Sequence, residues 1–379
     1  MGGKPPAARW AEHAAAWRDP AQILAHWADA GSVDRELLRH RASRDWWDIL
    51  DELGICLVVS REYEHLLVAH AASGGRGRQT FLPLPHPSGI AVDAARGVVH
   101  VASTRNPNQL VELEPALADE RPLVPARTRY LPGSLYLHDL ALVGGRLHGN
   151  AVGWNAVVRL DRPAPEPVWW PRSVERDGVP DLERNYLQLN SIAAGATLAR
   201  SYFSASAERP SGRRPGQRHF PVDGRGVVFS GRTREPVVRG LTRPHSARLH
   251  DGGLWVLNSG YGEVGRVEDG SFAPAARLRG WTRGLCFHGD FAFVATSRVI
   301  PRFRSYAPGL DVDGSVCGVH AVRVATGEVA ASLTWPAGNQ VFAVEAVPHT
   351  LSGGLPFEMR ASPARTRELF YRFTMRGNQ

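Results

Sequence analysis

The chain has 379 residues and a net charge of +8, carried mainly by arginine, with the apolar fraction of a folded globular protein. Its three cysteines, Cys56, Cys286 and Cys317, are far apart and show neither CxxC metal spacing nor a disulfide framework. This cysteine usage predicts a reduced, cytoplasmic protein. No apolar run reaches the roughly 18 residues of a membrane span, and the start MGGKPPAARW lacks a signal-peptide core, so we expect no membrane association. Scattered arginines argue against a nucleic-acid partner.

Residues 1–53 are predicted to form a helical extension. Trp10, Trp17 and Trp27 recur with apolar neighbours at three- and four-residue spacing, which is typical of helices packed on one face. A second helical pattern runs from Val33 to Leu53 and stops at Gly54. We expect this extension to pack on the main domain.

From residue 54 the period changes to two, and a strand–turn–strand unit with a polar start recurs to the end of the chain. The starts align at spacings of 50, 52, 55, 38 and 59 residues when the following positions are taken as equivalent: Ser88, His138, Asn190, His245, Arg283 and Phe342. Repeats of roughly 40–50 residues with four short strands are typical of propeller blades. We therefore predict an all-β fold, a six-bladed β-propeller over residues 54–379 after the helical extension.

Two insertions account for the longer spacings. Residues 204–226 are rich in proline, glycine and arginine, and residues 298–316 contain Pro301, Pro308 and Gly309, so both are predicted loops. Loops of this length are often functional. The ring is expected to close by pairing an N-terminal strand with residues Leu369 to Met375.

The predicted site lies where the innermost strands begin, because equivalent positions of a propeller face the central channel from one side. His138 and His245, with His86 or Asn190, are the candidate metal ligands, since converging neutral imidazoles bind zinc, iron or copper better than calcium. Structural roles in the channel are the alternative interpretation for each histidine.

Other polar residues are assigned around this metal site. Arg283 is expected to bind an acidic group, Asp139 to orient a histidine, and Glu263 to join them in catalysis. The candidate substrate-binding residues come from the blade starts, the facing turns and the 204–226 loop: Asn190, Asn155, Asn258, Arg213 and Arg218.

Several blocks carry a resemblance to a known family. RPHSARLHDGGLWVLNSGYGEVGRV, RGLCFHGDFAFV, CGVHAVRVATGEV and LHDLAL resemble blocks of a bacterial family known as a conserved hypothetical domain of unknown function. The resemblance covers about residues 45–350 and implies a six-bladed propeller. It also implies shared motif residues, which are His138, Asp139, His245, Ser246, Asn258, Glu263, Arg283 and Cys317.

A more distant resemblance concerns the segment PSGIAVDAARGVVHVA, which is similar to a blade of lactonase-type propellers. Those sites use glutamate with asparagine or aspartate, whereas two axial positions in this chain are histidines. The resemblance therefore carries function only by analogy.

Three functions follow. The first is a metal-dependent tailoring enzyme, oxidative or hydrolytic, that acts on a small acidic or peptide substrate at the channel mouth. The second is a non-catalytic propeller that binds a peptide or protein there. The third is a lactonase-like hydrolase that uses a divalent cation.

Overall fold

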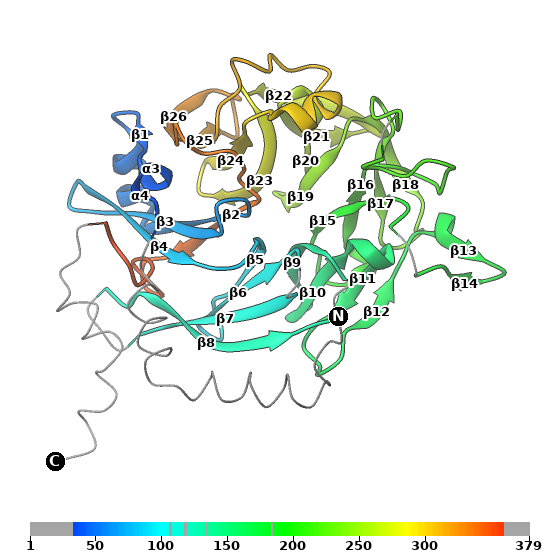
Figure 1. Ribbon diagram of the computed structural model, residues 1–379, viewed down its shortest axis with the longest axis horizontal. Coiled ribbons are helices and arrows are strands. Elements are labelled where there is room, and N and C mark those ends of the chain that lie inside the picture. The colour runs from blue at the N-terminus through cyan, green and yellow to red at the C-terminus, as the bar shows by residue number, and fades with distance from the viewer. Residues whose placement is uncertain are drawn as a thin grey trace, which may run out of the picture.

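The computed structural model describes residues 33–105, 108–116, 120–132, 135–182, 185–217 and 219–359. They form six antiparallel sheets arranged as blades around a central axis (Figure 1). The predicted six-bladed β-propeller is confirmed. None of the described helices has the length and apolar character needed to cross a membrane.

Each blade has four strands, ordered from the innermost to the outermost. The blades are blade 1 (β27 Ala343–Pro348, β2 Ile55–Arg61, β3 Leu66–Ser73, β4 Arg76–Pro83), blade 2 (β5 Pro87–Asp93, β6 Val98–Ser103, β7 Gln109–Pro115, β8 Leu123–Tyr130), blade 3 (β9 Leu137–Val143, β10 Arg146–Ala151, β11 Ala156–Arg159, β12 Glu166–Trp169), blade 4 (β15 Leu189–Ala193, β16 Tyr202–Ala205, β17 Gly226–Ser230, β18 Pro236–Leu241), blade 5 (β19 Pro244–His250, β20 Gly253–Asn258, β21 Glu263–Glu268, β22 Ser271–Arg277) and blade 6 (β23 Trp281–His288, β24 Phe291–Ser297, β25 Gly318–Arg323, β26 Val329–Thr334). The innermost strands contact one another in a closed ring.

Short elements decorate the blades. They are the hairpin β13 (Glu175–Arg176) and β14 (Val179–Pro180), and the 3-10 turns η1 (Val152–Trp154), η2 (Arg172–Val174), η3 (Leu198–Arg200), η4 (Ser259–Tyr261) and η5 (Pro301–Tyr306). The loop predicted at 204–226 lies between β16 and β17, and its first two residues and its last belong to these strands. η5 lies in the predicted 298–316 loop.

The ring closes in blade 1, where the N-terminal strand β2 pairs with the late strand β27 in six consecutive residue pairs. The expected partner of the N-terminal strand was wrong: residues Leu369 to Met375 lie outside the described residues, and β27 takes that place. This pairing removes the free inner edge that β2 would otherwise present.

The described part of the N-terminal segment, residues 33–53, contains two helices and one short strand. α3 (Arg35–Leu38) and α4 (Trp46–Leu53) are separated by the short strand β1 (Arg41–Ala42), which pairs with β26 and extends blade 6. α4 ends where Gly54 adopts a left-handed conformation, as its sequence predicts, and it buries Trp46, Ile49 and Leu50. The tryptophans at positions 10, 17 and 27 lie outside the described residues.

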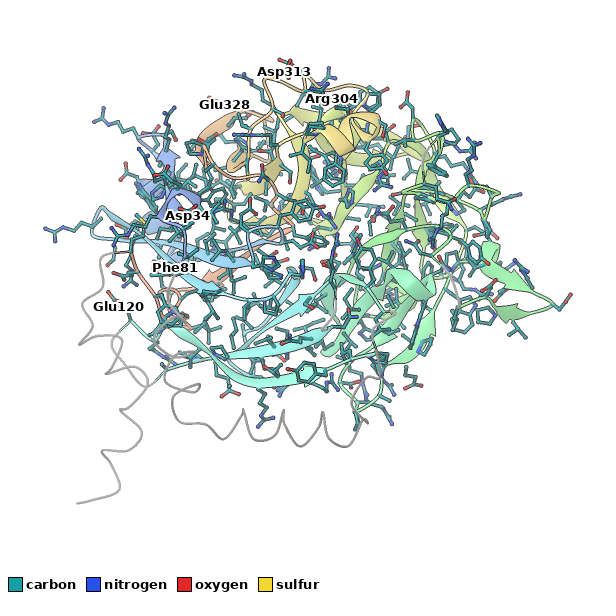
Figure 2. The ribbon with its side chains drawn as sticks, viewed as in Figure 1. Asp34, Phe81, Glu120, Arg304, Asp313 and Glu328 are labelled. Carbon is teal, nitrogen blue, oxygen red and sulfur yellow. The ribbon has the colours of Figure 1, made fainter. Side chains whose placement is uncertain are left out.

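The core lies between the blades. Residues that alternate along each strand point into the spaces between neighbouring sheets, and apolar side chains fill these spaces (Figure 2). Gly89 of β5 shows how closely the inner strands approach. A Cβ atom there would lie 2.5 Å from the backbone nitrogen of Leu140 in the next blade.

Candidate functional site

The aligned blade starts fall where the repeat places them. Ser88, His138, Asn190 and His245 are each the second residue of an innermost strand. Arg283 is the third residue of β23, and Phe342 directly precedes β27. The sequence alignment of the repeats is thus correct to within two residues around the ring.

A backbone feature recurs just before these starts. His86, Tyr136, Gln188 and Arg243 each directly precede an innermost strand, and their φ angles are 46°, 52°, 51° and 53°. This left-handed conformation costs a non-glycine residue about 1–2 kcal/mol, and such strain concentrates at functional sites. Four blades repeat it at one position, so the ring imposes the conformation.

The innermost strands are also bulged just after these starts. The register between the first and second strands shifts near the beginning of the innermost strand in blades 2 to 6. A bulge re-aims the side chains around it and is common beside active sites. Together the two features turn polar side chains toward the channel mouth.

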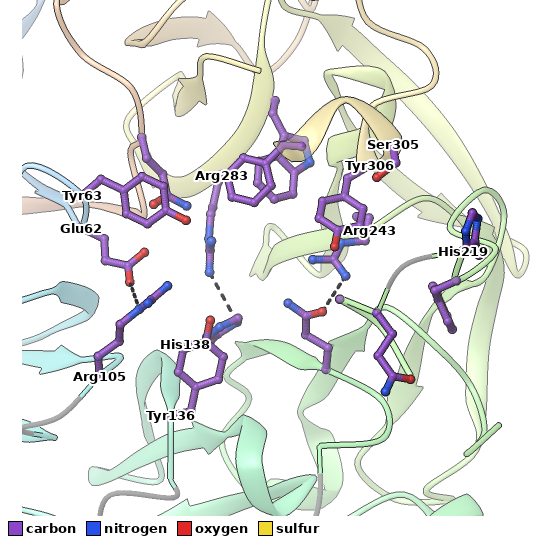
Figure 3. A pocket seen from close by; sticks show the side chains of 17 residues that line it. Glu62, Tyr63, Arg105, Tyr136, His138, His219, Arg243, Arg283, Ser305 and Tyr306 are labelled. Carbon is purple, nitrogen blue, oxygen red and sulfur yellow. Dashed lines mark hydrogen bonds and ion pairs between the residues drawn. The ribbon is translucent and has the colours of Figure 1, made fainter. Parts of the chain in front are cut away.

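A cavity of about 720 Å³ occupies that mouth, and all six blades contribute to its wall (Figure 3). Three of the four left-handed residues line it, namely Tyr136, Gln188 and Arg243. Its basic and acidic side chains are three arginines, two histidines and one glutamate: Arg105, Arg243, Arg283, His138, His219 and Glu62. With neutral histidines, the wall carries a formal charge of +2.

Arg243 is a buried cation held by neutral groups. Its Nη1 donates to Oε1 of Gln188 at 2.5 Å, and its guanidinium lies over the Tyr306 ring at 4.5 Å. Nε has no hydrogen-bond partner among the described residues. Burial lowers the pKa of Arg243 to about 10, so the group stays charged at neutral pH.

Arg283 repeats this arrangement from blade 6. Its guanidinium carbon lies 3.2 Å from the centre of the Phe342 ring. In the amide orientation that satisfies both of its neighbours, Gln340 donates to Glu62 and accepts a hydrogen bond from Nη1 of Arg283 at 3.3 Å. Burial lowers the pKa of Arg283 to about 10. Among the described residues, no carboxylate oxygen lies within 4.0 Å of Arg243 or Arg283.

Nδ1 of His138 faces two groups, Arg283 and its neighbour Asn190. That residue donates through Nδ2 to the carbonyl of Pro244 at 2.8 Å, so its Oδ1 faces Nδ1 of His138 at 3.2 Å, closer than Nη2 of Arg283 at 3.4 Å. With the proton on Nδ1, this atom donates to Asn190 and Nε2 keeps a lone pair; with the proton on Nε2, Nδ1 accepts from Arg283. Nε2 is buried and has no hydrogen-bond partner in the described part of the chain. Burial first, and then the charge of Arg283, hold the pKa of His138 well below its usual value.

The tautomer of His245 is indicated by Ser259. The Ser259 hydroxyl donates to the carbonyl of Thr282 at 2.6 Å, so it accepts from Nδ1 of His245 at 3.0 Å. Nε2 is again buried without a partner among the described residues. Burial and the charge of Arg283 hold the pKa of His245 well below its usual value. Its ring meets Trp281 edge-on, behind the cavity wall.

Glu62 carries the cavity's single carboxylate among the described residues. Its Oε1 accepts from the Thr104 hydroxyl at 2.5 Å and lies 3.5 Å from Nε of Arg105. His86 Nδ1 lies 3.7 Å from the same oxygen, and the His86 ring packs against His65. His86 therefore belongs to a cluster around Glu62.

The remaining predicted site residues lie away from the cavity lining. Asp139 pairs with Arg248, and Asn258 donates to Glu263 at 2.8 Å beside the blade 5 turn. Asn155 accepts hydrogen bonds from two backbone amides, those of Tyr186 and Leu187, and so fixes a loop. Arg213 is exposed and donates to a loop carbonyl. Arg218 lies outside the described residues.

The donor set for a metal is partial. His138 and His245 offer two imidazole nitrogens suited to zinc, copper or iron, whereas the described cavity wall offers calcium one carboxylate, that of Glu62, together with glutamine amide oxygens. No group of three or more His, Cys, Asp or Glu side chains able to hold an ion occurs within the described residues. A catalytic zinc site uses three protein ligands, so the donor set is one short.

Sequence reasoning missed several residues of the wall. Tyr136, Gln188 and Arg243 stand two positions before the aligned starts, and this shared offset was the available signal. Glu62 and Arg105 follow the second strands of blades 1 and 2. Charged residues directly after an apolar strand could have pointed to them.

Comparison with known proteins agrees with this architecture. The family model described as Domain of unknown function (DUF4915) matches residues 44–354. None of the curated proteins is significantly similar to this chain. A nidogen/laminin complex structure is similar with a TM-score of 0.52 and 8% identity, covering 77% of this chain and 98% of that chain.

Two further solved structures are similar at lower scores. A gluconolactonase from Xanthomonas campestris has a TM-score of 0.44 and 12% identity, covering 75% of this chain and 86% of that chain. Regucalcin, a calcium-binding protein from Agrobacterium tumefaciens, has a TM-score of 0.43 and 11% identity, covering 65% and 73%. At such low sequence identities, a similar fold does not indicate that the two proteins catalyse the same reaction.

Proposed function

This chain belongs to the DUF4915 family, and we propose that it is an enzyme acting on a small acidic substrate at the channel mouth. The observation that carries the proposal is the pair Arg243 and Arg283. Both guanidiniums are buried in one cavity wall, and no carboxylate oxygen of the described chain lies within 4.0 Å of either. Against the lowering by burial, Glu62 raises the pKa of Arg283 from a greater distance, and its carboxylate is paired with Arg105. A buried charge without a counterion is costly, so the counterion is expected to come from the ligand.

The chemistry of these donors selects the ligand. A guanidinium presents a rigid fork of N–H groups that matches the two oxygens of a carboxylate or phosphate. Gln188 fixes one fork, and the Phe342 ring supports the other. The ligand therefore meets preorganised donors and loses little free energy in ordering them.

His138 provides the acid–base group. Its Nε2 lone pair can accept a proton from a substrate hydroxyl or from a water molecule that attacks the substrate. In the free protein, the charge of Arg283 helps to keep the imidazole neutral. A bound anion would offset that charge, so substrate binding is expected to raise the pKa of His138 and make it a stronger base.

The test compares anion binding by matched variants, measured by calorimetry with inorganic phosphate and citrate. Arg283→Met keeps a long apolar side chain and removes the charge together with the guanidinium that lies over Phe342, and Arg283→Lys keeps the charge and removes the fork. We expect Arg283→Met to weaken binding at least tenfold. Arg127→Met is the control, because Arg127 is an exposed residue outside this cavity. Equal binding by Arg283→Met and the wild type would refute the proposal.

A second candidate is a metal-dependent enzyme with His138 and His245 as ligands. The two unpartnered Nε2 atoms favour it. A third ligand would have to come from substrate or solvent, and the metal would supply a Lewis acid beside the anion site. Metal analysis of wild type, His138→Ala and His245→Ala tests it. Stoichiometric zinc, copper or iron lost in both variants supports this candidate, and a metal-free wild type after reconstitution rejects it.

A further inference from the structure

The cavity has an aromatic wall beside the two buried arginines, Arg243 and Arg283, which we call its charged floor. Trp281 begins β23, Phe303 and Tyr306 lie on η5, and Tyr63 follows β2. These four side chains line the cavity, and Phe303 contacts the other three. The Tyr63 and Phe303 rings are stacked with centroids 6.3 Å apart, Phe303 lies 5.2 Å from Trp281, and Tyr306 lies 5.8 Å from Phe303.

The wall and the anion site are physically joined. Tyr306 supports the Arg243 guanidinium on its ring face. Trp281 lies two residues before Arg283 in the same strand, and its indole N–H is buried without a hydrogen-bond partner among the described residues. A ligand whose anionic group reaches the two arginines would therefore place its remaining atoms against aromatic faces.

We propose that the ligand is a small acid that carries a planar ring, with the acid on Arg243 and Arg283 and the ring against Phe303 and its neighbours. This inference rests on the proposed anion site and adds the second half of the ligand. Aromatic side chains bind flat groups through offset stacking and edge contacts, which add to the burial of apolar area. The volume of about 720 Å³ accommodates both parts of such a molecule.

The charge of the floor favours a dianion. Two buried guanidiniums are compensated most fully by two negative charges, as an aryl phosphate would supply. A ring-bearing carboxylate would share the fork geometry and compensate half of the charge. The same chemistry covers both ligands, and the experiment separates them.

The experiment measures dissociation constants by calorimetry for two matched pairs of probes. Phenyl phosphate is compared with methyl phosphate, and phenylacetate with acetate. We expect the ring-bearing member of a pair to bind at least tenfold more tightly. The pair with the tighter binding identifies phosphate or carboxylate as the anion.

Two variants from separate elements locate the ring. Phe303→Leu changes η5, and Tyr63→Leu changes the segment after β2, so a folding defect in one leaves the other informative. Each should reduce the preference for phenyl phosphate over methyl phosphate at least threefold. Unaltered preference in both variants would overturn the proposal.

The outcomes also separate this inference from the function on which it rests. If phenyl and methyl phosphate bind equally, and phenylacetate binds like acetate, the ring subsite is wrong while the anion site stands. If no member of either pair binds to the wild type, the anion site itself is wrong.

Discussion

Arg248 on β19 and Asp139 on β9 form a two-pronged ion pair across the channel. Nη1 lies 2.8 Å from Oδ2 of Asp139, and Nη2 lies 3.2 Å from Oδ1. Nη2 also reaches Glu345 on β27 at 3.2 Å. These residues belong to blades 5, 3 and 1, so one guanidinium joins alternate blades. Asp139, expected to orient a histidine, forms this cross-channel pair.

Removing Arg248 should destabilise the ring strongly. Arg248→Met leaves Asp139 buried without its cation, and breaking a buried pair in this way costs about 3–5 kcal/mol. Urea unfolding followed by circular dichroism measures the loss. Arg248→Met combined with Asp139→Asn removes both charges and should recover part of it. A single variant within about 1 kcal/mol of wild type would contradict a structural role for the pair.

Glu345 should make stability depend on pH. Burial, with the nearby Asp139 carboxylate, raises its pKa to about 7 against the opposing effect of Arg248. The native carboxyl thus binds a proton more tightly than the unfolded one, whose pKa is about 4.5. The contribution of Glu345 to the free energy of unfolding therefore falls as pH rises from about 4.5 to 7, by at most about 3 kcal/mol. Above pH 7 this contribution is constant.

Glu345→Gln tests this dependence. The stability of the variant should not fall in this way. The difference in unfolding free energy between the variant and the wild type should therefore increase, in favour of the variant, as pH rises from about 4.5 to 7. Glu268→Gln, at an exposed position, is the control and should follow the wild type. Parallel pH profiles for Glu345→Gln and wild type would show that Glu345 ionises normally.

Gly89→Ala should disturb the approach of blades 2 and 3. The added methyl group would meet the backbone of Asp139 and Leu140 at 2.5–2.7 Å, where no side-chain rotation can relieve the overlap. We expect a loss of about 2–3 kcal/mol. Gly212→Ala is the matched control, because nothing lies within 4 Å of its Cβ position. Equal denaturation midpoints for the two variants would mean that the inner strands shift to accept the methyl group.

Substitutions of Gln188 can distinguish the effect of backbone strain on stability from the effect of the Gln188 side chain on ligand binding. Both Gln188→Gly and Gln188→Ala remove the acceptor that fixes Arg243, so both should weaken phosphate binding. Glycine tolerates the left-handed conformation and alanine does not, so the glycine variant should be about 1 kcal/mol more stable than the alanine variant. Thermal unfolding and calorimetry supply the two readouts. A more stable alanine variant would show that the strain is absent.

The blade starts could be predicted because they depend on short-range patterns. Alternating apolar residues and glycine turns set the strands, and the recurrence of the unit then aligned His138, Asn190 and His245 on equivalent positions. The metal set could not be judged in this way. The position of a histidine in the propeller repeat does not determine where its imidazole nitrogens point. His86 lies beside Glu62 and His65.

The anion site depends on contacts between distant segments. Arg283 rests on Phe342, and Arg243 rests on Gln188 and Tyr306, so each guanidinium is positioned by residues from another part of the chain. The left-handed conformation of Tyr136 and Arg243 is likewise imposed by the ring, since their residue types do not favour it. Sequence patterns record local preference, and these features override it.

The closure of blade 1 by β27 also determines when the propeller can close during translation. A chain that emerges from the ribosome from its N-terminus displays β2 long before its inner partner exists. Gln340 and Phe342, which hold Arg283, emerge just ahead of β27. The binding cavity is therefore assembled late in translation, and a chain cut short before residue 340 would lack both the closed ring and the support of its anion site.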